Sequence, residues 1–460
     1  MTEVIQSDSS KQNSPLKTAP MPVSWRLGIA VAVVAIGSAA YFFQEQLASR
    51  ARAGLGILCF LGLIAAFSAN LRAVNWKTFA WGIFLQFSLG VAIIHVKPVQ
   101  QFFDAIVYVV KQFLAFTNEG SKFVFGKLAD PAAVAEVFKI PISDAVVFAF
   151  VALPTIIFVA SFFTVLYYFG ILQFVVRLMA KLMMYFMQTS GAETLSVSAN
   201  VFMGQTEAPL IIKPYVPRMT QSELLTMMVG GMAHISGALM AIYIEMGADA
   251  VAILATSVMA APCSLYLSKL LLPETEEPET RGTVKMVVER QHANVIDAAS
   301  GGAADGMRLA LNIAAMLIAF LAFIALFNSL LGAIHEGLTL QVVFSKIFAP
   351  VANLIGVDSQ DVPAVADLLG TKLVANEFVA YTNFQRMYLG SLSKRDIILV
   401  TYALTGFANF ASIGIQLGGI GGLAPNRRAD LARLGGRALF VGFVATMINA
   451  SIAGLLLKPE

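Results

Sequence analysis

Polar side chains interrupt a mainly apolar part of the chain between Asn200 and Arg218, in the run NVFMGQTEAPLIIKPYVPR. The run holds amides, a carboxylate and basic groups, and one glycine and three prolines break it. Proline kinks a helix, and an unpaired carboxylate at bilayer depth is costly. Irregular backbone survives there only when it is buried in protein or lines a wet cavity. The run therefore predicts a re-entrant hairpin at 189–218 whose tip, Gly204 to Glu207, faces a small solute. An ordinary cytoplasmic loop is the alternative.

A second polar interruption, at 361–391, predicts a second re-entrant hairpin. Its polar residues in a partly apolar setting are Asp367, Lys372, Asn376, Glu377, Thr382 and Arg386. A helix-start signal follows each hairpin, because 220–223 reads TQSE, a capping box, and 393–396 reads SKRD, a near relative. Further on, GMAHISG at 231–237 aligns with GFANFAS at 406–412. A hairpin and a broken helix, occurring twice, indicate an inverted-repeat transporter with its site at the bilayer midplane.

The polar residues of the two repeats indicate the chemistry of the solute. Helix packing explains small residues such as Gly231, but it does not explain Gln205, Glu207, Glu377 and Asn409. Carboxylates and amides accept hydrogen bonds from hydroxyl groups, and amides also pair with the edge of a heterocycle. A phosphate would require clustered arginines or a glycine nest, and neither converges here. These residues predict a neutral solute rich in hydroxyls and ring nitrogens.

The composition identifies a polytopic all-α membrane protein. The chain has 460 residues, 58% hydrophobic and only 13% charged, whereas soluble proteins carry about 25% charged residues. A net charge of +3 without a basic–aromatic stripe argues against nucleic acid as a partner. Cys59 and Cys263 lie far apart in apolar runs, and we interpret both as small buried hydrophobes. The apolar runs long enough to span a bilayer lie near 26–44, 53–71, 78–96, 145–169, 221–247, 250–272, 306–333, 394–419 and 434–457.

These runs divide the chain into seven parts. They are a disordered polar tail at 1–24, an extra transmembrane helix at 25–48, spans with an interfacial helix at 53–142, the first repeat at 143–272, a cytoplasmic loop at 273–305, a span at 306–340 and the second repeat at 341–460. A cleaved signal peptide is the alternative for 26–44. Residues 99–116 and 170–188 are amphipathic, which favours surface-lying helices. Arginines cluster at 427–437, so the positive-inside rule places the N-terminus in the cytoplasm and the C-terminus outside.

Five motifs, taken in order, resemble the concentrative nucleoside transporter family. They are GQTEAP at 204–209, MTQSEL at 219–224, VANEFVAY at 374–381, GFANF at 406–410 and LAPNRR at 423–428. The resemblance runs from about residue 55 to the C-terminus, and the short N-terminal part resembles that of bacterial members, which implies the inner membrane. It implies a homotrimer in which a scaffold, including 53–142 and 306–340, holds the subunits together. A mobile part with both hairpins would carry nucleosides such as uridine across in an elevator-like movement.

The resemblance also implies a set of nine substrate-contacting residues. Those at the nucleobase are Gln205, Thr206, Glu207 and Leu239, and those at the ribose are Glu377, Asn409 and Ser412, with Phe407 and Leu309 nearby. The chemistry agrees with this assignment, because a buried carboxylate is better satisfied when sugar hydroxyls donate to it. The alternative for Glu377 is a capped acid with a purely structural role.

Sodium is the predicted coupling ion, and a proton is the alternative. In family members that use sodium, the ion lies between the first hairpin tip and the broken helix that follows. The corresponding positions here are Asn200, Met203, His234 and Ile235. His234 replaces a small hydroxyl residue, and its ring offers no oxygen to a hard cation, although its backbone carbonyl does. A histidine titrates near neutral pH, so proton coupling is the alternative. An ordinary buried histidine is the third interpretation.

Two other classes of protein are weaker interpretations. A membrane enzyme would use Glu207 and Glu377 as an acid–base pair, but the chain has no HExxH or GxSxG motif. The glycine run at 419–424 resembles a dinucleotide fingerprint but lacks the strand–helix context. A channel would conduct without stoichiometric coupling. We therefore predict a transporter that is not an enzyme and has no cofactor other than its coupling ion.

Overall fold

The computed structural model describes residues 21–140, 145, 147–281 and 292–459. Within these ranges the regular elements are helices, and eight of them are long and apolar enough to cross a membrane. The prediction of an all-α polytopic membrane protein is therefore confirmed. Most of the predicted tail at 1–24 and part of the predicted loop at 273–305 lie outside the described residues.

The helices follow the predicted runs closely, with a few shifts at their ends. The helices in the first half are α1 (Val23–Phe42), α2 (Ser49–Ala66), α3 (Trp76–His95), α4 (Lys97–Ala115), α5 (Thr117–Phe125), α6 (Pro131–Phe138), α7 (Phe148–Tyr168), α8 (Ile171–Met187), α9 (Gly191–Asn200), α10 (Gln221–Ala233) and α11 (Gly237–Glu245). Those in the second half are α12 (Ala250–Leu271), α13 (Val295–Ile334), α14 (Leu340–Leu354), α15 (Val362–Val374), α16 (Glu377–Asn383), α17 (Lys394–Leu404), α18 (Phe410–Leu423) and α19 (Arg428–Leu456). Because α13 begins at Val295, the loop predicted to reach residue 305 is shorter than expected.

The two hairpins differ in their second arms. In the second hairpin, α15 packs against α16, and both arms are helical. In the first, α9 packs against a 3₁₀ turn at Ala208–Ile212, and another short turn follows at Val216–Arg218. Prolines at 209, 214 and 217 recur too often for an α-helix to form there. The first hairpin is therefore helical on one side only.

Two broken helices follow the hairpins, as the alignment of 231–237 with 406–412 predicted. The first consists of α10 and α11, and the second of α17 and α18. The two breaks touch, because Phe407 N donates to His234 O at 3.1 Å. Gly406 makes this approach possible: its φ is +141°, and a Cβ there would lie 2.8 Å from Thr446 Cγ2. We call this contact the break joint.

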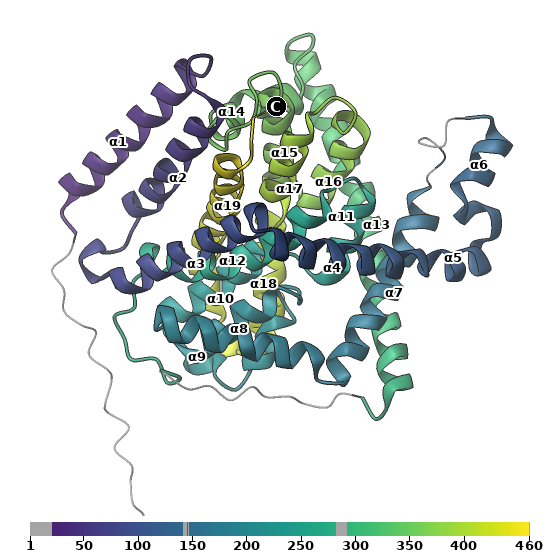
Figure 1. The fold of residues 1–460 in the computed structure, drawn as a ribbon, viewed down its shortest axis with the longest axis horizontal. Coiled ribbons are helices and arrows are strands. Elements are labelled where there is room, and N and C mark those ends of the chain that lie inside the picture. The colour runs from purple at the N-terminus through teal and green to yellow at the C-terminus, as the bar shows by residue number, and fades with distance from the viewer. Residues whose placement is uncertain (1–20, 141–144, 146, 282–291, 460) are drawn as a thin grey trace, which may run out of the picture.

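The remaining spans form two groups (Figure 1). Helices α7 and α13 pack tightly on each other, because α13 places the small residues Ala298, Gly302, Gly306 and Ala310 at every fourth position. A Cβ at Gly302 would lie 2.5 Å from Thr164 Oγ1 of α7, which is the close backbone approach typical of membrane helices. Along this face α7 also contacts α11, which brings the pair against the first broken helix.

The other spans pack beside the hairpins and broken helices. Within the region 53–142, α2 packs on α19 and α3 packs on α12, and both of those partner helices are mostly buried. A buried polar link fixes α3 there, because Gln86 Nε2 donates to Asn449 Oδ1 and Gln86 Oε1 accepts from Tyr266, both at 2.7 Å. The extra helix α1 lies alongside α2 and α14 at the edge of the molecule (Figure 1).

Candidate substrate site

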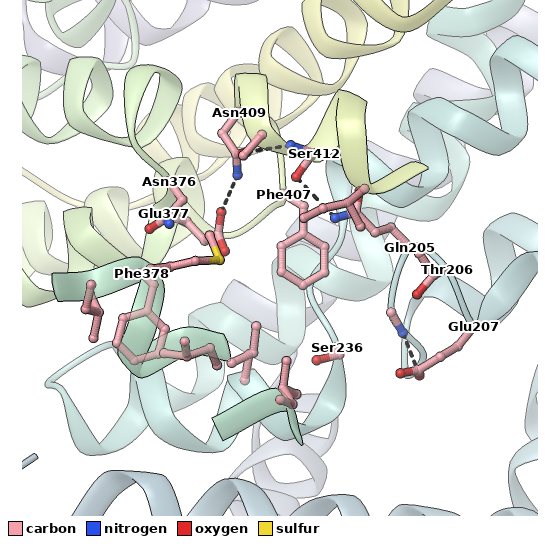
Figure 2. A pocket seen from close by; sticks show the side chains of 18 residues that line it. Gln205, Thr206, Glu207, Ser236, Asn376, Glu377, Phe378, Phe407, Asn409 and Ser412 are labelled. Carbon is pink, nitrogen blue, oxygen red and sulfur yellow. Dashed lines mark hydrogen bonds between the residues drawn. The ribbon is translucent and has the colours of Figure 1, made fainter. Parts of the chain in front are cut away.

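Helix ends from both repeats meet around a cavity of about 170 Å³. The first hairpin tip, the two breaks and the second hairpin tip contribute its polar side, and α13 contributes its apolar wall (Figure 2). One water molecule needs about 10–15 Å³ of such space, so the cavity admits a small organic molecule. All nine residues predicted to contact substrate line this cavity. They are Gln205, Thr206, Glu207, Leu239, Leu309, Glu377, Phe407, Asn409 and Ser412.

Glu377 lies at the first position of α16, where two neighbours donate to its carboxylate. Asn409 Nδ2 donates to Oε2 at 2.8 Å, and the Tyr243 hydroxyl donates to Oε1 at 3.3 Å. The N-terminus of a helix also favours a negative charge. Asn409 holds its amide in place by capping α18, because Ser412 N donates to Asn409 Oδ1 at 2.9 Å. Each carboxylate oxygen keeps further acceptor capacity, which a sugar hydroxyl could use.

The first hairpin tip faces this cluster from across Phe407 (Figure 2). Gln205 Nε2 donates to Ser412 Oγ at 3.1 Å, so the tip is hydrogen-bonded to the start of α18. Gln205 Oε1 is buried and has no partner among the described residues. Glu207 bends back on its own turn, where Gly204 N donates to Oε2 at 3.0 Å. A free amide oxygen and a held carboxylate suit the N–H edge of a heterocycle.

Several further lining residues escaped the sequence prediction. The polar ones are Ser236 and Asn376, and the apolar ones include Ile313, Met316, Leu317 and Phe378. Asn376 caps α16, because Val379 N donates to its Oδ1 at 2.8 Å. Ile313 and Leu317 follow Leu309 at four-residue spacing, which places them on one helical face. That spacing was a usable signal, whereas Tyr243 reaches Glu377 from α11 without any sequence motif.

The residues predicted for sodium lie behind the first hairpin tip. Asn200 ends α9, where its Nδ2 donates to Ser196 O at 3.1 Å and its Oδ1 is buried without a partner among the described residues. An orphaned buried oxygen is costly, and a hard cation such as Na⁺ would satisfy it. The residues present therefore fit sodium, with the carbonyls of Met203 and Ile235 as further candidate oxygens.

His234 is buried at the break, and its ring does not face the substrate cavity. Its Nδ1 lies 2.8 Å from Gly230 O, and its backbone carbonyl accepts from Phe407 N in the break joint. The ring therefore replaces an ordinary helix hydrogen bond where α10 ends. This geometry matches the third interpretation, a buried histidine that is hydrogen-bonded through Nδ1.

The site presents hydrogen-bonding groups and apolar surface to a bound solute. Its acceptors and amides are held by neighbours, and they surround a space walled by leucine, isoleucine and phenylalanine side chains. Two hairpins, two broken helices and a polar site where they meet are the architecture of inverted-repeat secondary transporters. The fold and the site thus define the class of the protein.

Comparison with known proteins identifies the family. The family model "Na+ dependent nucleoside transporter N-terminus" matches residues 55–128, and "Na+ dependent nucleoside transporter C-terminus" matches 252–454. A third model, "Nucleoside recognition", matches 149–264. An uncharacterized transporter of Haemophilus influenzae is 40% identical, over 88% of this chain and 97% of that protein. The chain belongs to the sodium-dependent, or concentrative, nucleoside transporter family.

Mammalian and structural relatives agree with this assignment. Mouse sodium/nucleoside cotransporter 1 is 44% identical over 436 residues, which are 90% of this chain and 64% of that protein. The chain thus spans about two thirds of the length of its mammalian relatives. The structure of CNTnw in an inward-facing substrate-bound state superposes with a TM-score of 0.82 at 36% identity, over 88% of this chain and 97% of CNTnw.

Proposed function

We propose that this protein is a secondary active transporter that imports nucleosides such as uridine together with sodium. The observation that carries the proposal is the cavity to which both repeats contribute. On one side Glu377 and Asn409 offer hydrogen-bonding groups for ribose hydroxyls, and on the other Gln205 offers a free amide oxygen for a base. Leu239 and Leu309 add the apolar surface that a flat ring requires.

Sodium is the coupling ion in this proposal, and Asn200, Met203, His234 and Ile235 hold it through oxygens. The orphaned Asn200 Oδ1 supports this choice, and so do the names of the mammalian relatives. The hairpins and broken helices move as one body against α7 and α13, in an elevator-like step. Helix α7 packs far more extensively on α13 than on α11, which supports that division.

The assembly and its orientation extend the same proposal. The protein is a homotrimer in a bacterial inner membrane, with its N-terminus in the cytoplasm and its C-terminus outside. The cytoplasmic side is the one that carries Arg427, whose guanidinium donates to Met219 O at the foot of the first hairpin. Exposed apolar side chains along α13, such as Ile318 and Phe323, suit contact with lipid or neighbouring subunits.

Uridine uptake into proteoliposomes with an imposed sodium or pH gradient tests the proposal. We expect saturable uridine accumulation that requires an inward sodium gradient. Accumulation driven by pH and indifferent to sodium would assign a proton as the coupling ion. Chemical conversion of uridine would indicate an enzyme, and equilibration without accumulation would indicate a channel.

A further inference from the structure

Lys372 is a fully buried lysine that the proposed mechanism does not yet use. It lies in α15, the first arm of the second hairpin, and 0% of its surface is exposed. Its Nζ donates to Ala403 O at 2.7 Å and to Thr446 Oγ1 at 3.0 Å, and it lies 5.7 Å from the centre of the Phe443 ring. An ammonium has three N–H donors. Two of those of Lys372 bind oxygens, and the Phe443 ring lies beside the charged group.

Lys372 makes no ion pair with a carboxylate in the described part of the chain, which sets it apart from the other buried lysine. Lys269 lies 2.7 Å from Glu193 Oε2 and 3.2 Å from Glu274 Oε2. Burying a charge without a direct partner is expensive. A buried lysine keeps its charge only where neighbouring groups supply negative potential in some other form.

The C-terminal end of α17 supplies part of that potential. Ala403 is the penultimate residue of α17, so its carbonyl is one of the last four, which lack partners within the helix. The C-terminus of a helix carries roughly half a negative charge. The break after Leu404 exposes this end inside the protein, and the ammonium of Lys372 lies against it.

The first repeat has a matching arrangement without the lysine. Asn200 ends α9, the first arm of its hairpin, and packs against the last turn of α10, where a Cβ at Gly230 would lie 2.9 Å from Asn200 Nδ2. In both repeats the end of the first hairpin arm meets the end of a half-helix. Half-helix ends and unwound carbonyls are where transporters of this architecture coordinate their coupling cations.

We propose that Lys372 is a cation built into the second repeat, at the place where the first repeat binds a free one. This inference rests on the proposed function for the sodium of the first repeat. Lys372 is a positioning residue, because it acts on substrate through Glu377, five positions further along the hairpin. The ammonium and that carboxylate interact electrostatically through the protein interior. The second repeat therefore balances its buried acid without a free cation.

Two neutral substitutions that differ in volume test this role. Lys372→Ala leaves space for a cation beside Ala403 O, whereas Lys372→Met fills that space with apolar atoms. We expect each to lower uridine uptake about tenfold or more, equivalent to ~1.4 kcal/mol. In Lys372→Ala alone, added methylammonium or higher sodium restores uptake, and the Hill coefficient for sodium rises from about one towards two. Lys372→Met responds to neither cation.

Lys269→Ala is the matched control, because it removes a buried lysine that serves an ion-pair network. We expect it to lower thermal stability while the Hill coefficient for sodium stays at the wild-type value. Two results would overturn the inference. One is wild-type uptake with an unchanged Hill coefficient in Lys372→Ala. The other is a folded Lys372→Ala protein whose lost uptake no cation restores.

A stability measurement covers the case in which the single variants do not fold. The double variant Lys372→Met/Glu377→Gln removes both charges, so we expect a monodisperse protein with a higher Tm than Lys372→Met alone. A double variant no more stable than the single one would overturn the charge-balance role. This measurement needs no transport, so it separates the inference from the proposed function, which fails if wild-type protein shows no sodium-dependent uridine uptake.

Discussion

Replacing Glu377 by glutamine is the sharpest test of the proposed ribose site. The carboxylate accepts from Asn409 Nδ2 at 2.8 Å and from the Tyr243 hydroxyl at 3.3 Å, and it retains capacity for two sugar hydroxyls. Glutamine keeps the volume and one acceptor. Its amide oxygen can still face Asn409 and its NH₂ group can donate to the Tyr243 oxygen, so we expect the folded protein to persist.

The magnitude follows from the hydrogen bonds that the substrate would lose. A hydrogen bond to a charged group contributes about 1.5–3 kcal/mol, so losing the bonds to two hydroxyls would cost roughly 3–6 kcal/mol. One factor of ten corresponds to ~1.4 kcal/mol, so uridine affinity should fall at least about a hundredfold. Uptake into proteoliposomes and equilibrium uridine binding measure the effect, with Tm as the test of folding.

Glu223→Gln is the control for losing a buried carboxylate elsewhere. Glu223 is 1% exposed, accepts from Thr220 N at 2.9 Å and from Ser190 Oγ at 2.5 Å, and does not line the cavity. We expect Glu223→Gln to lower Tm and to leave the KM for uridine unchanged, whereas Glu377→Gln weakens uridine binding. A folded Glu377→Gln protein with wild-type KM and rate would refute the assignment of Glu377 to the ribose.

Three further predictions follow from single contacts. Gln205→Leu removes the unpaired amide oxygen at the hairpin tip, so competition among nucleosides should show an altered base preference of about tenfold, and an unchanged profile would contradict base contact. Asn200→Ala removes the orphaned Oδ1, so the sodium concentration for half-maximal uptake should rise about tenfold while base preference stays the same. A sodium dependence like that of the wild type would count against the ion site. Gly406→Ala places a side chain on a residue with a φ of +141°, against Thr446, and should cost about 1–3 kcal/mol of stability. Gly414 has open space around it, so the control Gly414→Ala should leave Tm unchanged. Equal Tm values for the two variants would refute the strain at the break.

The sequence predicted the elements of the site well because their signals are local. Polar residues and prolines in apolar surroundings marked the first hairpin, and capping residues marked the helix starts at Thr220 and Ser393. Alignment of the two repeats then placed both breaks. The nine substrate residues come together in one cavity because they lie within or beside these motifs, except for Leu309, which the family resemblance supplied.

The remaining features depend on packing between distant segments, which no local pattern records. The link from Gln86 to Asn449 joins residues far apart in the chain, so the sequence did not predict the placement of α3 beside α12 and α19. Of the α13 residues that line the cavity, only Leu309 was predicted, because the four-residue spacing of the wall is shared by any buried helix face. The contact of Tyr243 with Glu377 was also not predicted, because a tyrosine in an apolar span does not indicate which carboxylate it will contact.

The break joint has a mechanical consequence. A single backbone hydrogen bond, from Phe407 N to His234 O, joins the breaks of two helices that lie far apart in the chain. Any motion that separated the two breaks would leave the Phe407 amide and the His234 carbonyl without a hydrogen-bond partner inside the protein. The least costly movement therefore carries both broken helices together, as a single rigid carrier requires.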